Sequence, residues 1–300
     1  MKLIFTVIGF FLLPLGAFAW SAAGHEMGGA IAYWYLKANK PEAIAKVVSI
    51  LEKHPWYGKE WDAKLFGLKG EQKEIGLFML ASIFPDEARR TPFGSGEKTK
   101  WHYINYQFKP SNLPTPPQDT LNAENKLKEL ILGISGKTGE EQALDLCWIF
   151  HILEDLHQPL HTTAMFDQFH LAGDKGGNDT WFTFKEEGKP IRLHSFWDGL
   201  LKGSFDTIPD KAKQLYESSN YAEKALVELK QNPKISDWVK NESVPLAISK
   251  AYLNGTINGI EEAATLVPIS YKTESIEIAE RRVVLSGIRL GKTLAGLFGA

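Results

Sequence analysis

Apolar residues recur at spacings of three and four positions along most of the chain, with polar residues between them. This is the pattern of helices that bury one face. It predicts helices over residues 22–37, 41–53, 71–83, 121–134, 140–157 and 237–253, and a last helix from about residue 275 to residue 297. The segment 108–119 contains four prolines and is therefore predicted to be a loop.

One segment has the pattern of a β-hairpin instead. "TWFTFK" is followed by the turn "EEGK" and then by "PIRLH", which places two short strands within residues 180–193. Neither a repeat nor a low-complexity linker nor a shift in composition marks a second domain. We therefore predict the all-α class: a single, mainly helical domain over residues 20–300 with one short β-hairpin.

The first nineteen residues resemble a secretory signal peptide in composition. Lys2 precedes a nearly continuous apolar run, residues 3–15, and Ala17 and Ala19 are small residues at the −3 and −1 positions of a cleavage site. The run is too short to span a membrane, and an uncleaved anchor is the alternative interpretation. Cleavage after Ala19 would make Trp20 the first residue of a secreted or periplasmic protein that has no membrane span.

Composition narrows the function further. The formal net charge is −2 and no basic block stands out. This argues against binding of the duplex DNA backbone through lysine and arginine side chains alone. The single cysteine, Cys147, excludes an intramolecular disulfide and is predicted to be a buried small hydrophobe. A secreted chain without disulfides needs another source of stability, and bound metal is one candidate.

Histidine and aspartate residues recur at a spacing that suits metal binding. His151 and Asp155 stand four positions apart in "WIFHILEDLHQPLH", which places both side chains on one helix face, and His161 follows on the emerging loop. "LHSFWD" repeats the spacing with His194 and Asp198. One such pair is weak support for a metal site, whereas two copies are harder to attribute to chance.

Two more candidates lie among apolar residues, Asp86 in "LASIFPDEARR" and His102 in "WHYIN". Burial of a carboxylate or an imidazole is costly without a partner, and convergence on metal ions would satisfy the whole set. Imidazole nitrogen with carboxylate oxygen favours zinc, because calcium and magnesium prefer oxygen ligands. A helical bundle with core histidines and no metal is the alternative.

Six motifs together resemble a known family. "WSAAGH", "FPDEAR", "WHYIN", "HILEDLHQPLH", "GGN" and "LHSFWD" occur in the order found in the zinc-dependent nucleases that include fungal single-strand-specific nucleases and plant bifunctional nucleases. A more distant relative of that family is the bacterial zinc phospholipase C. The motifs run from Trp20 to Asp198, and the rest of the chain is compatible in length and helicity but carries no signature.

The resemblance implies a mainly helical fold that holds three Zn²⁺ ions in a cleft. It assigns the first zinc to Asp86, His102, His151 and Asp155, and the second to His161, His194 and Asp198. It assigns the third to His25, to Asp155 as a bridge, and to the amino nitrogen and carbonyl oxygen of Trp20. A backbone amide nitrogen is a very poor ligand, so signal cleavage at Trp20 and the third site predict one another.

The function that the resemblance implies is hydrolysis of single-stranded DNA and RNA to 5′-phosphorylated products, with 3′-nucleotidase activity. Three zinc ions outweigh the charges of Asp86, Asp155 and Asp198, and this surplus would attract a phosphodiester. Zinc lowers the pKa of bound water to about 7, so a hydroxide between the first and third zinc would attack phosphorus. Arg89 would brace the phosphoryl oxygens, or else it is a surface arginine.

The resemblance also suggests substrate contacts. Tyr103 occupies the place of an aromatic that stacks on an unpaired base, and Asn178 of "GGN" would contact the base. Asn105 stands where fungal members tend to carry aspartate, so their base preference does not transfer to this chain. His157 points away from the face of His151 and is excluded from the ligands, while His54 and His170 are expected at the surface. No protein partner is implied, and we expect a monomer.

Two other functions remain open at this stage. A zinc phospholipase C acting on phosphatidylcholine-type lipids has a similar metal cage, but its resemblance favours glutamate where this chain has Asp198. A zinc-binding protein without catalysis would need a missing ligand or a blocked cleft, and no ligand position of the family is missing here.

Overall fold

The computed structural model describes residues 20–110 and 113–299. Residues 1–19, over which the signal peptide is predicted, lie outside the described residues. The longer helices are α1 (Ala22–Asn39), α2 (Pro41–Leu51), α4 (Glu71–Glu87), α5 (Ala123–Gly133), α6 (Gly139–Asp155), α9 (Ile208–Glu217) and α13 (Ser270–Phe298). The shorter ones are α3 (Asp62–Leu65), α7 (Pro159–Thr162), α8 (Leu193–Asp198), α10 (Glu228–Gln231), α11 (Ile235–Trp238) and α12 (Val244–Leu246).

The remaining regular segments are short. The 3₁₀ turns are Gly96–His102, Ile134–Gly136, Ser219–Tyr221, Glu223–Ala225 and Leu253–Gly255, and the π-helical turns are Val239–Ser243 and Ala247–Ala251. The strands are β1 (Tyr106–Phe108), β2 (Thr163–Met165), β3 (Trp181–Thr183), β4 (Ile191–Arg192) and β5 (Thr265–Leu266). The mainly helical class is therefore confirmed.

Most predicted helices are present with small shifts at their ends. α1, α2, α4, α5, α6 and α13 correspond to predicted segments. α5 begins at Ala123 because the side chain of Asn122 accepts a hydrogen bond from the backbone N–H of Asn125, 3.0 Å away, and so caps the helix. α13 begins at Ser270, earlier than predicted, and α9 was not predicted.

The helix predicted over residues 237–253 is present, although it is not a regular α-helix throughout. α11, the first π-helical turn, α12 and the second π-helical turn follow one another without a break from Ile235 to Ala251. Pro245 lies at the start of α12 and has no N–H to donate. The first π turn contains Glu242 and Ser243, which are buried and bonded to Arg282 of α13. A tertiary contact with α13 thus accompanies the departure from regular helix.

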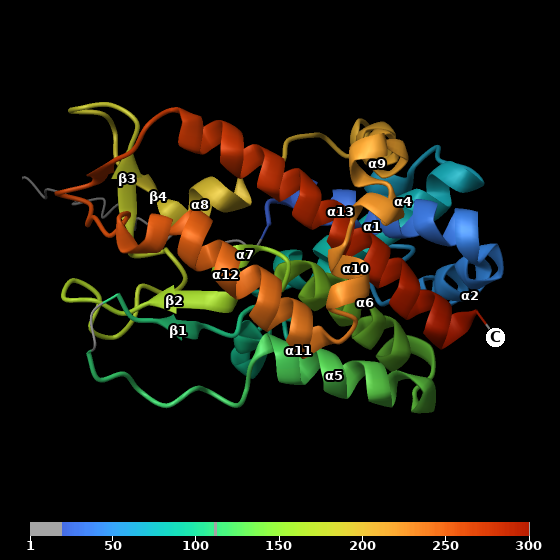
Figure 1. The fold of residues 1–300 in the computed structure, drawn as a ribbon. Helices are drawn as coiled ribbons and strands as arrows, with labels where there is room; N and C mark the ends of the chain where they lie inside the picture. The colour runs from blue at the N-terminus through green and yellow to red at the C-terminus, as the bar shows by residue number, and fades with distance from the viewer. Residues whose placement is uncertain (1–19, 111–112, 300) are drawn as a thin grey trace, which may run out of the picture.

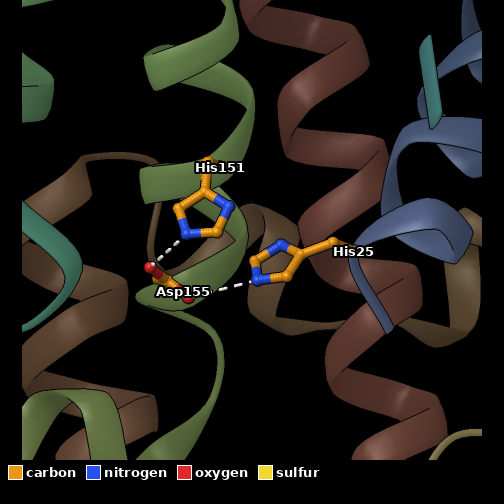
Figure 2. A group of neighbouring side chains, drawn as sticks. All are labelled: His25, His151 and Asp155. Atoms are coloured by element: carbon orange, nitrogen blue, oxygen red, sulfur yellow. Dashed lines mark ion pairs between the residues drawn. The ribbon is translucent and has the colours of Figure 1, made fainter. Parts of the chain in front are cut away.

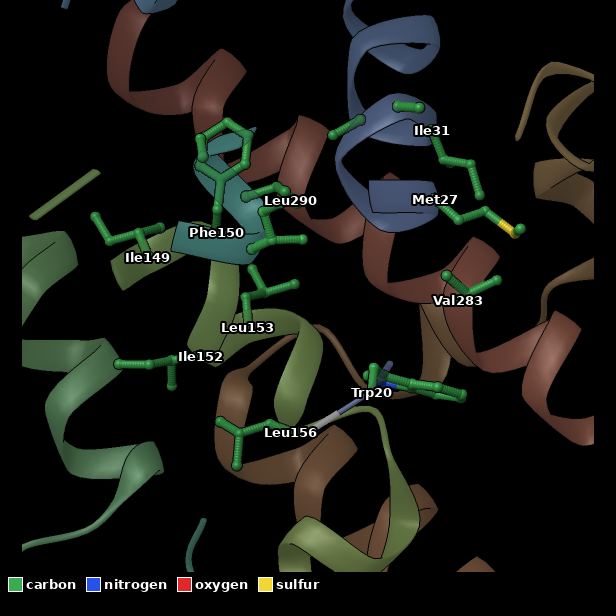
Figure 3. Close-up of a cluster of buried hydrophobic side chains, with 14 of the residues drawn as sticks. Trp20, Met27, Ile31, Ile149, Phe150, Ile152, Leu153, Leu156, Val283 and Leu290 are labelled. Carbon is green, nitrogen blue, oxygen red and sulfur yellow. The ribbon is translucent and has the colours of Figure 1, made fainter. Parts of the chain in front are cut away.

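The core lies between the long helices. α1 packs against α4, α9 and α13, and α6 packs against α4 and α5. α6 is buried along nearly its whole length from Ala143 to Asp155, so its polar residues face protein rather than solvent. Figure 3 shows Trp20 beside Leu156 and Val283 within this core, so the first described residue is anchored there. Cys147 is buried, as predicted.

The short strands gather at one end of the molecule, opposite the end that contains α2 and the C-terminus (Figure 1). β3 and β4 form the predicted antiparallel hairpin, and β5 adds to β3 in parallel. β1 and β2, which were not predicted, pair in parallel with Tyr106 opposite Thr163. This pairing brings the segment after His102 beside the segment after His161. None of the helices in the described part of the chain is both long enough and apolar enough to cross a membrane.

Candidate metal centre

Eight side chains from the sequence motifs come together between the helices. α1 contributes His25, α4 contributes Asp86, and the 3₁₀ turn Gly96–His102 contributes His102. α6 contributes His151 and Asp155, α7 contributes His161, and α8 contributes His194 and Asp198. All are buried except Asp86, whose side chain is 10% exposed. Their ligand atoms form three groups in which the atoms lie within 4.8 Å of one another.

The first group lies where α4, α6 and the 3₁₀ turn meet. The Nδ1 of His102 is 2.8 Å from the Nε2 of His151, 3.6 Å from Asp86 Oδ1 and 3.2 Å from Asp155 Oδ2. The Nε2 of His151 is 3.5 Å from Asp86 Oδ1 and 3.1 Å from Asp155 Oδ2. Two nitrogens and two carboxylate oxygens therefore converge on one small volume.

Asp155 also faces a second group through its other oxygen. Its Oδ1 lies 3.4 Å from the Nε2 of His25, and the rings of His25 and His151 stack with centroids 4.0 Å apart. Figure 2 shows Asp155 between the two histidines, with His151 one turn away on α6 and His25 reaching across from α1. This carboxylate is therefore placed to bridge two neighbouring cation positions.

The third group is formed by α7 and α8. The Nε2 of His194 is 3.3 Å from Asp198 Oδ2, and the Nε2 of His161 is 3.9 Å from Asp198 Oδ1. Gln158 donates a hydrogen bond to Asp198 Oδ1 over 2.8 Å, which fixes the carboxylate. The spacing of four between His194 and Asp198 thus places both side chains on one face, as the sequence predicted.

Hydrogen bonds on the far side of the rings select which nitrogen faces each group. The Nδ1 atoms of His151, His161 and His194 lie 2.7, 2.7 and 2.6 Å from the carbonyl oxygens of Ser82, His102 and Gly176, respectively. A carbonyl can only accept, so each Nδ1 carries the hydrogen and each Nε2 keeps its lone pair. This is the arrangement of histidines that bind metal.

Several atoms aimed at the groups are left without partners. The Nε2 atoms of His25 and His161 and the Oδ1 of Asp155 are buried and have no hydrogen bond to any described residue. Buried polar atoms are normally satisfied, so a set of lone pairs that converge here is typical of residues that bind a cation. Imidazole and carboxylate in this number suit zinc, and the residues therefore fit a bound metal.

Burial governs most pKa values in the centre, but at His151 it is outweighed by Asp155 and Asp86, which raise the pKa of that ring. Burial lowers the pKa values of His25, His102 and His161 well below the ordinary value and that of His194 to about 4, which keeps these rings neutral. It raises the pKa of Asp155 to about 6 and that of Asp198 well above its usual range. Neutral imidazoles are ready to bind metal, and a bound cation would hold the buried carboxylates ionised.

Sequence reasoning missed Glu154. This side chain is 1% exposed, and its Oε2 lies 2.7 Å from the Nδ1 of His25. The hydroxyl of Ser82 donates to its other oxygen over 2.9 Å. The signal that was available is the acid itself, which stands directly before Asp155 in "WIFHILED", where five of the other residues are large and apolar.

Backbone close to the centre is also specialised. Gly176 has φ +66°, and a Cβ there would lie 2.4 Å from the carbonyl oxygen of Leu160. Its own carbonyl accepts the hydrogen of His194. Glycine at position 176 therefore lets the backbone of "GGN" lie close to the carbonyl of Leu160. The side chain of Asn178 makes a local hydrogen bond, donating to the carbonyl of Lys175 over 2.9 Å.

Trp20 lies beside the centre. Its side chain is 1% exposed, and its indole N–H donates to the carbonyl of Glu154 over 3.2 Å. The next residue, Ser21, donates its backbone N–H to the carbonyl of Asp198 over 2.9 Å. These contacts tie the first described residues to α6 and α8, the helices that carry Asp155 and Asp198.

Arg89 and the two candidate base contacts lie at the edge of the centre. Arg89 is partly exposed, and its Nε donates to Asp86 Oδ1 over 2.8 Å. Tyr103 is 39% exposed and lines a cavity of about 230 Å³ with Asn105, which has the unusual φ of +56°. Amide side chains of Gln107, Gln118 and Asn122 line the same cavity.

Two histidines are misplaced by the sequence analysis. His54 and His170 were expected at the surface, and both are buried. His54 stacks on Trp61 with centroids 4.3 Å apart, and His170 lies between Asp167 and the carbonyl of Asp179. His157 is separate from the ligand groups, as predicted, because its ring lies against Trp238 and Arg289.

Comparison with known proteins agrees with the motif resemblance. A family profile described as S1/P1 Nuclease matches residues 20–299. Two proteins of Arabidopsis thaliana, Endonuclease 4 and Endonuclease 2, are 26% and 29% identical to this chain over 175 residues. The matched segments cover 52% and 51% of this chain and 50% and 51% of those proteins, so the chain spans about half the length of the curated relatives it matches.

Proposed function

Because this chain belongs to the S1/P1 nuclease family, we propose that it is a zinc-dependent nuclease with 3′-nucleotidase activity. Its substrates are single-stranded DNA and RNA, and its products carry 5′-phosphates. The observation that supports this most directly is the convergence of buried, unpartnered ligand atoms from α1, α6 and α7.

The proposed ligands follow the three groups. Residues of the first zinc site are Asp86, His102, His151 and Asp155, and those of the second are His161, His194 and Asp198. The third site uses His25, Asp155 and the amino nitrogen and carbonyl oxygen of Trp20. Bound zinc supplies Lewis-acid polarisation of a phosphoryl oxygen and an activated water at ordinary pH.

The protein's own residues hold and orient the reaction. Asp155 contributes one oxygen to each of two groups, so it fixes the spacing between them. Arg89, at the exposed edge, braces phosphoryl oxygens as negative charge develops, and its bond to Asp86 keeps it close to the centre. Trp148 packs edge-on against His102, and Trp101 packs against Trp148, so aromatic rings cover that side of His102.

Selection of single strands rests on the cavity beside His102. Tyr103 offers a half-exposed ring for stacking, which requires an unpaired base and tolerates any base identity. Asn105 both donates and accepts hydrogen bonds, so it meets a base edge without the acceptor-only restriction of an aspartate. Asn178 contributes a further polar contact.

The N-terminus links export to metal binding. Cleavage after Ala19 gives Trp20 a free amine, which chelates together with its own carbonyl oxygen. The protein is exported, to the periplasm or beyond the cell, and the third site is complete only once the signal peptide has been removed. Anchoring of Trp20 to the carbonyl of Glu154 supports this placement.

One experiment on the exported protein tests the proposal. Mass spectrometry under non-denaturing conditions should report a chain that begins at Trp20 and carries three zinc ions. Assays should show hydrolysis of single-stranded DNA and RNA well above duplex DNA, with release of phosphate from 3′-nucleotides. Hydrolysis of phosphatidylcholine vesicles alone would instead identify a phospholipase C. Bound zinc without hydrolysis of any phosphoester would identify a zinc-binding protein without catalysis.

A further inference from the structure

Glu154 is a buried acid that connects three helices next to the proposed metal centre. Its Oε2 lies 2.7 Å from the Nδ1 of His25 on α1, and its Oε1 accepts a hydrogen bond from Ser82 on α4. Glu154 itself lies on α6, directly before Asp155. The Nε2 of His25, on the opposite side of the ring, has no hydrogen bond to any described residue.

We propose that Glu154 is a positioning residue that prepares His25 to bind a cation. A carboxylate oxygen of Glu154 accepts the Nδ1 hydrogen of His25, which leaves the lone pair on Nε2, 3.4 Å from Asp155 Oδ1. It thereby fixes both the tautomer and the angle of the ring. This role rests on the proposed function, and it extends the ligand set by one residue that does not touch the metal.

The surroundings of Glu154 leave room for this role. The side-chain groups that the structure hydrogen-bonds to it are a hydroxyl and an imidazole, and neither is a permanent cation. A buried carboxylate without a cation carries a large desolvation cost. A cation held by His25 and Asp155 would offset that cost through one imidazole.

α1 has glycine residues where it packs against Glu154 and Ser82. A Cβ added to Gly28 would lie 2.6 Å from Glu154 Oε1, and a Cβ added to Gly29 would lie 2.5 Å from the Oγ of Ser82. Glycine in the interior of a helix costs about 1 kcal/mol relative to alanine. The glycine pair, three positions after His25, thus leaves the space that Glu154 and Ser82 occupy.

A different protonation of the pair would remove the role. A neutral Glu154 would donate its hydrogen to His25 Nδ1, and the ring hydrogen would then lie on Nε2. His25 could not bind metal in that form. Glu154 would then serve only to connect the three helices, and the ¹⁵N chemical shifts of His25 distinguish the two tautomers.

The test compares Glu154→Gln with Glu26→Gln in the exported chain that begins at Trp20. Glu26 is a matched control because it is a buried acid beside His25 on α1 whose charged neighbours are Lys64 and Glu87. Zinc titration of the metal-free proteins should show one ion bound about 10–100-fold more weakly in Glu154→Gln. The affinities of the other ions, and all affinities of Glu26→Gln, should be unchanged. The ¹⁵N spectrum of wild-type protein should show hydrogen on Nδ1 of His25.

The outcomes separate this inference from the proposed function. Wild-type protein that binds no zinc would refute the function, whereas wild-type affinities in Glu154→Gln would refute only the role of Glu154. An equal loss at every zinc site would also overturn the inference, because it would indicate a general structural effect. If Glu154→Gln does not fold, Ser82→Ala provides the test. Loss of the hydroxyl that holds the Glu154 carboxylate should weaken the affinity for the same single zinc ion severalfold. An unchanged affinity would reject the proposal.

Discussion

Two buried clusters of charged side chains lie on either side of the end of α6, and they differ in how completely their polar atoms are paired. The first is the candidate metal centre, where atoms of His25, Asp155 and His161 have no hydrogen bond to described residues. The second is the cluster of Glu242, Arg282 and Arg289, which joins α13 to the π-helical turn Val239–Ser243.

In the second cluster, the hydrogen-bonding capacity of the carboxylate is filled by neighbouring side chains. Each oxygen of Glu242 accepts two hydrogen bonds, from Asn232, Arg282 and Arg289. Burial would raise the pKa of Glu242, but Arg289 and Arg282 hold it below the usual value. Arg282 also donates to the carbonyl of His157, just beyond the end of α6.

The difference shows how two polar clusters in one core serve different purposes. Closed pairing, as at Glu242, holds the C-terminal helix against the turn that follows Asp155 and leaves no bonding capacity for a ligand. Open pairing, as at Asp155, leaves lone pairs directed at one another, a state that a cation would relieve. In this pair of clusters, it is the convergence of unpartnered ligand atoms, and not the presence of charged residues, that distinguishes the candidate site from structural packing.

The largest expected effect comes from breaking the open cluster at its bridge. Asp155→Asn weakens an oxygen ligand in two groups, so activity on single-stranded DNA should fall by at least about 1,000-fold, equivalent to several kcal/mol. Zinc content measured on the same preparation should fall with it. His170→Asn, which changes a buried histidine outside the ligand groups, is the control. Near wild-type activity in Asp155→Asn would mean that the bridge is not part of the reaction.

A substitution in the fully paired cluster of Glu242, Arg282 and Arg289 should lower the stability of the fold and leave zinc binding and catalysis largely unchanged. Glu242→Gln leaves two buried guanidinium groups without their carboxylate and should lower the free energy of unfolding by about 3–5 kcal/mol. In metal-free protein, Asp155→Asn should change that free energy far less, because it removes a carboxylate that no guanidinium group pairs with in the way that Arg282 and Arg289 pair with Glu242. Urea denaturation of both variants with a chelator present measures this contrast. Equal destabilisation by the two variants would contradict the distinction between open and closed clusters.

A third variant lies outside both clusters. Tyr103→Ala removes the half-exposed ring beside His102 and should weaken the binding of single-stranded DNA by about 1–3 kcal/mol, while zinc content and unfolding stay unchanged. Measured KM values should rise, and kcat should fall less. Tyr103→Phe should retain most of the affinity, since stacking needs the ring and not the hydroxyl. A parallel loss in both variants would show that the hydroxyl is what matters.

The smallest effect concerns pH and an unclustered imidazole. Burial lowers the pKa of His54 to about 3. Between about pH 3 and 6.5, His54 is therefore protonated in the unfolded chain and neutral in the folded protein. Stability should therefore be full above pH 6.5 and fall by about 1.4 kcal/mol per pH unit below it. His54→Leu, compared with wild type under chelation, should have a shallower slope by this amount. Identical slopes would show that His54 is protonated in the folded state.

The sequence anticipated the metal centre because helix geometry is local. A spacing of four fixes the face on which His151 and Asp155 lie, whatever surrounds the helix, and the same holds for His194 and Asp198. The structure brings these side chains together, and their assignment to three zinc ions remains a prediction. Local rules failed for His54 and His170, because composition does not show that aromatic or carboxylate partners will cover a histidine.

By itself, the sequence determined most of the long helices, though not α9, together with the hairpin and the residues able to bind metal, since each depends on spacing within one segment. Only the tertiary structure decided which residues support them. Glu154 acts on His25, and Glu242 on Arg282, across 129 and 40 positions of chain. Such pairs arise when helices pack, and no periodicity within a single helix records which neighbour it will meet.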